Sequence, residues 1–192
     1  MNVYDFDDTI FTPDSSLCFL LYCLRHYPRA VLTILPSSAL QFAVYRFGGK
    51  KDAKKLKEAL FSFLNRIDNA AQIAEYFWDR HFERVESWYL DQKRSDDLII
   101  SASPEFLLKP AAERLGVELI ATPMNPYTGK IHGKNCHDRE KLRRFRERFP
   151  NGKVDEFYSD SLSDEPMAEI AEKAFLVRKG ERFPWPRKSE NE

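Results

Sequence analysis

Three carboxylates within four residues open the chain: Asp5, Asp7 and Asp8 lie in the stretch DFDDT, directly after the short β-prone run 2–4. A carboxylate cluster at the end of a buried strand costs free energy unless a positive charge lies against it. A single D-x-D stretch in a soluble protein is nevertheless more often an acidic surface turn than a site. The significance of this cluster therefore depends on what the rest of the chain supplies.

Three further groups with phosphate or metal chemistry follow later, each after an apolar run or in a first helical turn. They are Ser101, Lys141, and the acids Asp160 and Asp164. Taken one at a time, each has an ordinary structural explanation: a serine at a strand–helix junction is usually a cap, and a lysine in a basic run usually faces solvent. Acids such as Asp160 and Asp164 near a helix start can simply stabilise the helix through its dipole. The joint pattern, and no single residue, favours a phosphate-transfer site.

Strand and helix patterns alternate from residue 95 onward. We expect strands at 97–101, 117–121, 154–159 and 174–177, and helices at 104–116, 138–149 and 163–173. Ser103 is the expected N-cap of the helix at 104–116, with Pro104 at its first position. This alternation predicts an α/β fold, a Rossmann-like parallel sheet with helices on both faces. In such sheets ligands bind at the carboxyl ends of the strands, which would gather the chemistry-bearing side chains at one edge.

Residues 14–94 contain only helical patterns. We expect helices from 17 to 26, from an Asp52 cap through Leu64, and from Asn69 to Leu90. The chain is therefore predicted to consist of a core domain, 1–13 and 95–192, with an all-helical cap domain, 14–94, inserted after the first strand.

Composition limits the possible partners of the protein and its cellular location. Thirty basic residues balance thirty acidic ones, so no global field favours nucleic acid. Three cysteines without a metal-type pair and no signal-peptide pattern indicate a cytoplasmic protein. The uncharged stretch 30–45 is shorter than a membrane span and is interrupted by Pro36. Peripheral contact between the cap and a membrane surface stays open, and the oligomeric state is not indicated.

Four motifs in this order resemble the haloacid dehalogenase-like (HAD) superfamily, in particular its helical-cap subgroup, which includes phosphoserine phosphatases. Residues 5–9 match the family's D-x-D-x-T, Ser101 matches the second motif and Lys141 the third. Residues 158–164, YSDSLSD, match the fourth motif, with Ser159 where the family commonly has glycine. The resemblance covers nearly the whole chain. It is close in the sheet domain, whereas the cap is similar only in being helical and inserted after the first strand.

The resemblance implies a catalytic pair and a metal. Asp5 would be the nucleophile and Asp7 the general acid and base. Mg²⁺ would be held by the side chains of Asp5 and Asp160 and by the backbone carbonyl of Asp7. Asp164 would hold the groups around the metal in place without binding the ion directly, acting through water or Lys141.

The resemblance also implies a phosphate-binding set. Ser101, the backbone N–H of Ala102, and Lys141 would bind and neutralise the phosphate oxygens. Asp14 matches the position at which phosphoserine phosphatases carry a glutamate that binds the substrate amine.

The function expected from these residues is Mg²⁺-dependent hydrolysis of a small phosphomonoester through an aspartyl-phosphate. Asp7 favours phosphate esters over halides, because a departing halide needs no acid. Two alternatives stay open. One is a phosphatase for a lipid-linked phosphate such as phosphatidylglycerophosphate, and the other is a non-catalytic binding module on the same fold.

Overall fold

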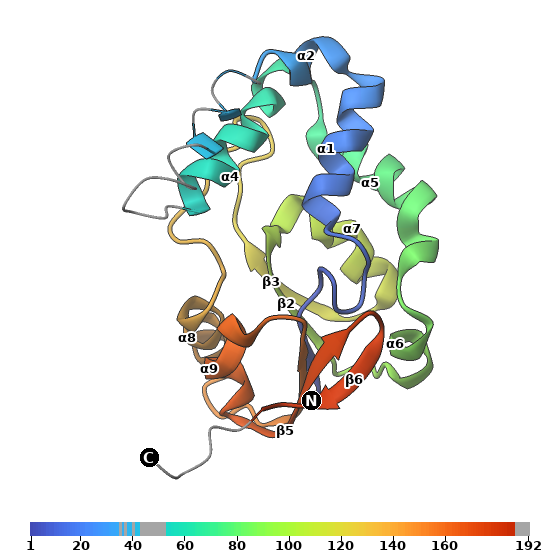
Figure 1. Ribbon diagram of the computed structural model, residues 1–192, viewed down its shortest axis with the longest axis vertical. Helices are drawn as coiled ribbons and strands as arrows, with labels where there is room; N and C mark the ends of the chain where they lie inside the picture. The colour runs from blue at the N-terminus through green and yellow to red at the C-terminus, as the bar shows by residue number, and fades with distance from the viewer. Residues whose placement is uncertain (35, 37, 40, 43–52, 187–192) are drawn as a thin grey trace.

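A six-stranded sheet lies at the centre of the protein, in the order β3-β2-β1-β4-β5-β6. The computed structural model describes residues 1–34, 36, 38–39, 41–42 and 53–186 (Figure 1). The strands are β1 Val3–Tyr4, β2 Leu98–Pro104, β3 Glu118–Thr122, β4 Val154–Ser159, β5 Ala171–Arg178 and β6 Glu181–Pro184. The first five pair in parallel and β6 pairs antiparallel with β5. The predicted α/β class with a mainly parallel sheet is confirmed.

The helices form two groups along the chain, those of the expected cap and those of the core. Between β1 and β2 lie α1 Ser15–His26, α2 Pro28–Leu32, α4 Ala53–Phe61, η1 Ser62–Arg66, α5 Ala70–His81, η2 Phe82–Arg84 and α6 Ser87–Gln92. After β2 come α7 Glu105–Leu115, α8 Arg139–Arg148, η3 Leu162–Asp164 and α9 Glu165–Ala168. The expected Asp52 cap and part of the uncharged stretch 30–45 lie outside the described residues. No helix in the described part of the chain is long and apolar enough to span a bilayer.

Alternate strand residues point to opposite faces of the sheet. Val3 and Phe157 pack in one cluster with Phe145 of α8 and Met167 of α9. Tyr4 and its neighbours on the other face pack in a second cluster with α7 and α5. The period of two along each strand therefore gives both faces an apolar lining, and helices cover both of them.

The second cluster continues without interruption into the inserted helices. Phe19 of α1 and Trp78 of α5 belong to the same cluster as Tyr4 and Leu107 of the sheet region. The Trp78 indole N–H also donates a 2.6 Å hydrogen bond to the Leu107 carbonyl. The division into residues 14–94 and the remainder stays a prediction, and the two parts share one apolar core.

The prediction that Ser103 caps the following helix is wrong. β2 continues through Pro104, α7 begins at Glu105, and no side chain caps its N-terminus. The Ser103 hydroxyl instead donates to Asp7, and its N–H donates to the Ser101 hydroxyl. These contacts keep the backbone extended, and β2 ends at Pro104, three residues beyond the predicted strand end at Ser101.

The predicted helix at 163–173 is also wrong. It is reduced to η3 and the four-residue α9, and β5 begins at Ala171. Residues 171 and 173 pair in parallel with Val154 and Glu156 of β4, so ladder hydrogen bonds outweigh the local helical pattern. The tail after Gly180 adds an unexpected antiparallel edge strand, β6.

Candidate active site

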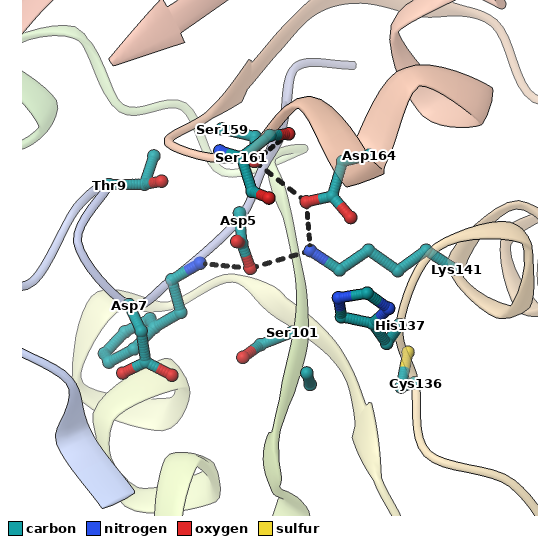
Figure 2. Close-up of polar contacts among 12 residues, drawn as sticks. Asp5, Asp7, Thr9, Ser101, Cys136, His137, Lys141, Ser159, Ser161 and Asp164 are labelled. Atoms are coloured by element: carbon teal, nitrogen blue, oxygen red, sulfur yellow. Dashed lines mark hydrogen bonds and ion pairs between the residues drawn. The ribbon is translucent and has the colours of Figure 1, made fainter. Parts of the chain in front are cut away.

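Asp5 lies at the carboxyl end of β1, beside one buried cation. Its Oδ1 accepts a 2.8 Å hydrogen bond from the Phe6 N–H and lies 2.8 Å from the Lys141 Nζ (Figure 2). Burial raises the pKa of the Asp5 carboxyl, and the Lys141 ammonium opposes that shift. The outer carboxylate oxygen, Oδ2, has no partner among the described residues, so it is available to an incoming group.

Lys141 reaches the site from the first turn of α8, and its side chain is fully buried. Its ammonium lies between two carboxylates, 2.8 Å from Asp5 and 2.6 Å from Oδ2 of Asp164. Burial alone would lower the pKa of Lys141, but these two carboxylates raise it above its ordinary value. Lys141 is therefore a permanent positive charge beside Asp5.

Ser159, at the position where the family commonly has glycine, holds Asp164 in place. Its hydroxyl donates to Asp164 Oδ2 at 2.8 Å and accepts from the Ser161 N–H (Figure 2). The other carboxylate oxygen of Asp164, Oδ1, is buried without a hydrogen-bond partner among the described residues. A buried carboxylate oxygen without a partner is costly, which indicates that water or a cation satisfies it.

Asp7 lies in a different environment from Asp5. Its Oδ1 accepts from the Ser15 N–H at 2.7 Å, and its Oδ2 accepts from the Ser103 hydroxyl at 2.5 Å. No cation of the described residues forms an ion pair with it. Burial, followed by the nearby Asp14 carboxylate, raises the pKa of Asp7 to about 7. A carboxyl group with such a pKa can donate and accept a proton near neutral pH.

Asp160 follows β4 and is oriented from the first loop. Its N–H donates to the Thr9 hydroxyl at 2.9 Å, which joins the end of β4 to the D-x-D-x-T turn. Burial, and then the charges of Asp5 and Asp8, raise the pKa of Asp160 to about 6. Carboxylates that raise one another's pKa lie at a place where a cation would be stabilising.

These groups surround a cavity of about 180 Å³. Each site residue predicted from the sequence lines it: Asp5, Asp7, Asp14, Ser101, Ala102, Lys141, Asp160 and Asp164. Asp14 also accepts from the Leu17 N–H and so caps α1. The cavity is smaller than the roughly 300–1,000 Å³ of pockets that enclose a drug-sized ligand. It suits a phosphoryl group whose remaining substituent extends outward.

The donor set fits Mg²⁺, and the fit rests on few side chains. Carboxylate and carbonyl oxygens are the ligands that this ion prefers, and it usually keeps several waters. Among the described residues no three His, Cys, Asp or Glu side chains gather into a cage. The predicted set needs only the Asp5 and Asp160 carboxylates with the Asp7 carbonyl. Asp164 Oδ1, which is buried and has no hydrogen-bond partner among the described residues, would be free to accept from a water of the bound ion.

Sequence reasoning did not place Ser103, Lys57 or His137 at this site. Ser103 could have been found, because it is two residues from Ser101 on a strand and so shares its face. Lys57 of α4 donates to the Ala102 carbonyl at 2.6 Å, and burial lowers its pKa. No sequence signal connects Lys57 with a motif forty-five residues away. His137 is exposed at the cavity edge, where its Nε2 lies 3.3 Å from the Ser163 hydroxyl.

Comparison with known proteins identifies the family. The family model of haloacid dehalogenase-like hydrolases matches residues 3–169. The chain belongs to that family. The predicted family is thus confirmed, and the fold and the order of the four motifs follow from it.

Two kinds of relative extend the comparison. Protein CicA of Caulobacter vibrioides is 30% identical over 92% of this chain and 86% of its own. A Bordetella pertussis Tohama I protein of unknown function superimposes with a TM-score of 0.73 at 21% identity, over 91% of this chain and 87% of its own. A phosphoserine phosphatase with a phospho-aspartyl intermediate analogue superimposes with a TM-score of 0.52 at 12% identity, over 90% of this chain and 83% of its own.

Proposed function

We propose that the protein is a Mg²⁺-dependent phosphatase that hydrolyses a small phosphomonoester through an aspartyl-phosphate on Asp5. The observation that carries the proposal is the contrast between two carboxylates in one loop. Asp5 lies against the Lys141 ammonium, whereas Asp7 is held by a hydroxyl and an amide. Two carboxyl groups with such different contacts can take different roles, one as the nucleophile and the other as the acid.

The first half of the reaction transfers the phosphoryl group to the protein. A carboxylate oxygen of Asp5 attacks phosphorus, and the bond from phosphorus to the ester oxygen breaks. Asp7 gives its proton to the departing oxygen, which leaves as an alcohol. Ser101, the Ala102 N–H and Lys141 bind the non-bridging oxygens as their charge shifts.

The second half restores Asp5. The ionised Asp7 takes a proton from a water molecule, whose oxygen attacks phosphorus, and the acyl-phosphate bond breaks to release inorganic phosphate. Mg²⁺ supplies charge neutralisation, which lets two anions approach each other. Asp5 and Asp160, with the Asp7 carbonyl, would hold the ion, and Asp164 would fix Lys141 and a bound water.

Two other functions are less well supported. A binding module without catalysis is disfavoured because both Asp5 and Asp7 are present and face one cavity. Phosphoserine has no specific support as the substrate, because the Asp14 side chain caps α1 and so already has a hydrogen-bond partner. We propose a cytoplasmic location, since Cys18, Cys23 and Cys136 are all free thiols.

Phosphate release from a panel of esters, with Mg²⁺ and with EDTA, tests the proposal. The panel includes an aryl phosphate, phosphoserine, sugar phosphates, nucleotides and a dispersed phosphatidylglycerophosphate. We expect Mg²⁺-dependent turnover that Asp5→Asn abolishes. Asp91→Asn is the matched control, since Asp91 is exposed on α6 and does not line the cavity. Turnover that survives Asp5→Asn would contradict the proposal.

A further inference from the structure

Helix α1 is apolar on two faces, and only one of them is covered. Cys18, Phe19 and Cys23 are buried against the core. On the opposite side Leu17, Leu21 and Leu24 are 51%, 55% and 37% exposed. Their spacing of four and three residues places these leucines in one stripe along the helix. A stripe of this kind on a surface helix marks a contact surface.

The charge around the stripe has one sign. From Ser15 to Lys51 the sequence has no aspartate or glutamate, although the whole chain is neutral. Arg25, in the last turn of α1, and Arg29, in α2, are exposed, and neither pairs with a carboxylate among the described residues. The acids that balance the chain therefore lie outside residues 15–51, and Arg25 and Arg29 place positive charge at the C-terminal end of the stripe.

We propose that this outer face of α1 docks on an anionic lipid bilayer. Leu17, Leu21 and Leu24 would enter the boundary between headgroups and acyl chains, with Arg25 and Arg29 at the lipid phosphates. Interfacial helices bind by this combination of buried apolar area and attraction to anionic lipid. A second copy of the chain fits less well, because a two-fold contact would set the same acid-free surface against itself.

The docked orientation brings the candidate active site close to the bilayer. Asp14 caps the start of α1 and also lines the catalytic cavity, while the stripe begins at Leu17, whose N–H donates to Asp14. Helices α1, α2 and α4 stand together beyond the carboxyl ends of the strands, whereas α6 lies beside β6 (Figure 1). Docking itself does not depend on the phosphatase chemistry, so each can be tested without the other.

Co-sedimentation with vesicles of equal parts phosphatidylglycerol and phosphatidylcholine tests the proposal. We expect the full chain to sediment with these vesicles and to stay in the supernatant when the vesicles contain phosphatidylcholine alone. Leu21→Glu should weaken binding roughly tenfold or more, because it places a charge in the apolar boundary. Arg25→Gln should weaken it about fivefold, and added salt should weaken it further.

Leu90→Glu is the matched control, since Leu90 of α6 is 42% exposed and lies outside the stripe. This variant should bind vesicles like the unchanged protein. Asp5→Asn should also bind, which separates docking from catalysis, and Leu21→Glu should keep turnover of a water-soluble ester. Failure of the unchanged protein to bind anionic vesicles would overturn the proposal. So would a Leu21-dependent dimer that binds no vesicle.

Discussion

The carboxylates of Asp5 and Asp7 differ in what their oxygens contact. Asp5 is fixed by Lys141 and by an amide, so it stays close to a positive charge. Asp7 is fixed by Ser103 and by the Ser15 amide, and burial raises its pKa to about 7. Ser103 thus serves as a positioning residue for the proposed acid and need not contact the substrate.

Replacement of Ser103 should affect substrates according to their leaving groups. We expect Ser103→Ala to lower kcat roughly tenfold on an alkyl phosphate, whose departing oxygen needs a proton from Asp7. The loss should be much smaller on a nitrophenyl phosphate, which leaves without one. Ser103→Thr keeps the hydroxyl and should restore turnover. Equal losses on both substrates would show that Ser103 matters only for the fold.

At the scale of the element, the start of α8 is held by Glu140. Its carboxylate, 8% exposed, accepts from Arg143 and from Arg144, and Arg144 also donates to the Ala121 carbonyl at the end of β3. Hydrogen bonds from Arg143, then from Arg144, lower the pKa of Glu140 to about 2. Glu140 therefore fixes the turn from which Lys141 enters the site.

Glu140→Gln should destabilise the protein by about 1–2 kcal/mol at neutral pH, since hydrogen bonds to a charged group are lost. Because the folded pKa lies below the unfolded one, the stabilisation is complete above about pH 5 and disappears as the pH falls toward 2. Urea unfolding at pH 7 and at pH 3 should show the difference between the two proteins shrink. Glu147→Gln, at an exposed carboxylate of the same helix, should change stability by less than about 0.5 kcal/mol. A Glu140→Gln cost that does not fall with pH would contradict this account.

Sequence patterns predicted β2 because residues 98–100 are a continuous apolar run, and they predicted β4 between the helix stop at 150–152 and Asp160. They failed where contacts distant in sequence determine the local structure. Ser103 looks like a cap until Asp7 is placed against it, and residues 171–173 look helical until β4 lies alongside. The residues predicted from the motifs all line one cavity, whereas the place of Lys57 depends on how the inserted helices fold back over β2.

At the scale of the molecule, one apolar cluster joins the inserted helices to the sheet. Trp78 of α5 packs with Phe6 and Phe11 of the loop after β1, at ring-centroid distances of 5.7 and 5.0 Å. The loop that bears Asp5 and Asp7 is therefore packed directly against the predicted cap. Its geometry depends on both parts of the chain.

A shared core predicts that the chain unfolds in one cooperative transition. Tryptophan fluorescence, which reports on Trp78 among other residues, and far-ultraviolet circular dichroism should give coincident urea midpoints. Two separated transitions would show that the inserted helices and the sheet are independent units.

The identity of the nucleophile is the central claim, and its direct test is to find the phosphoryl group on the protein. Enzyme quenched in acid during turnover with Mg²⁺ should carry phosphate on the peptide that contains Asp5, as mapped by mass spectrometry. The Asp5→Asn protein should carry none. Turnover with no phosphorylated Asp5, or with the group on another residue such as His137, would contradict the account.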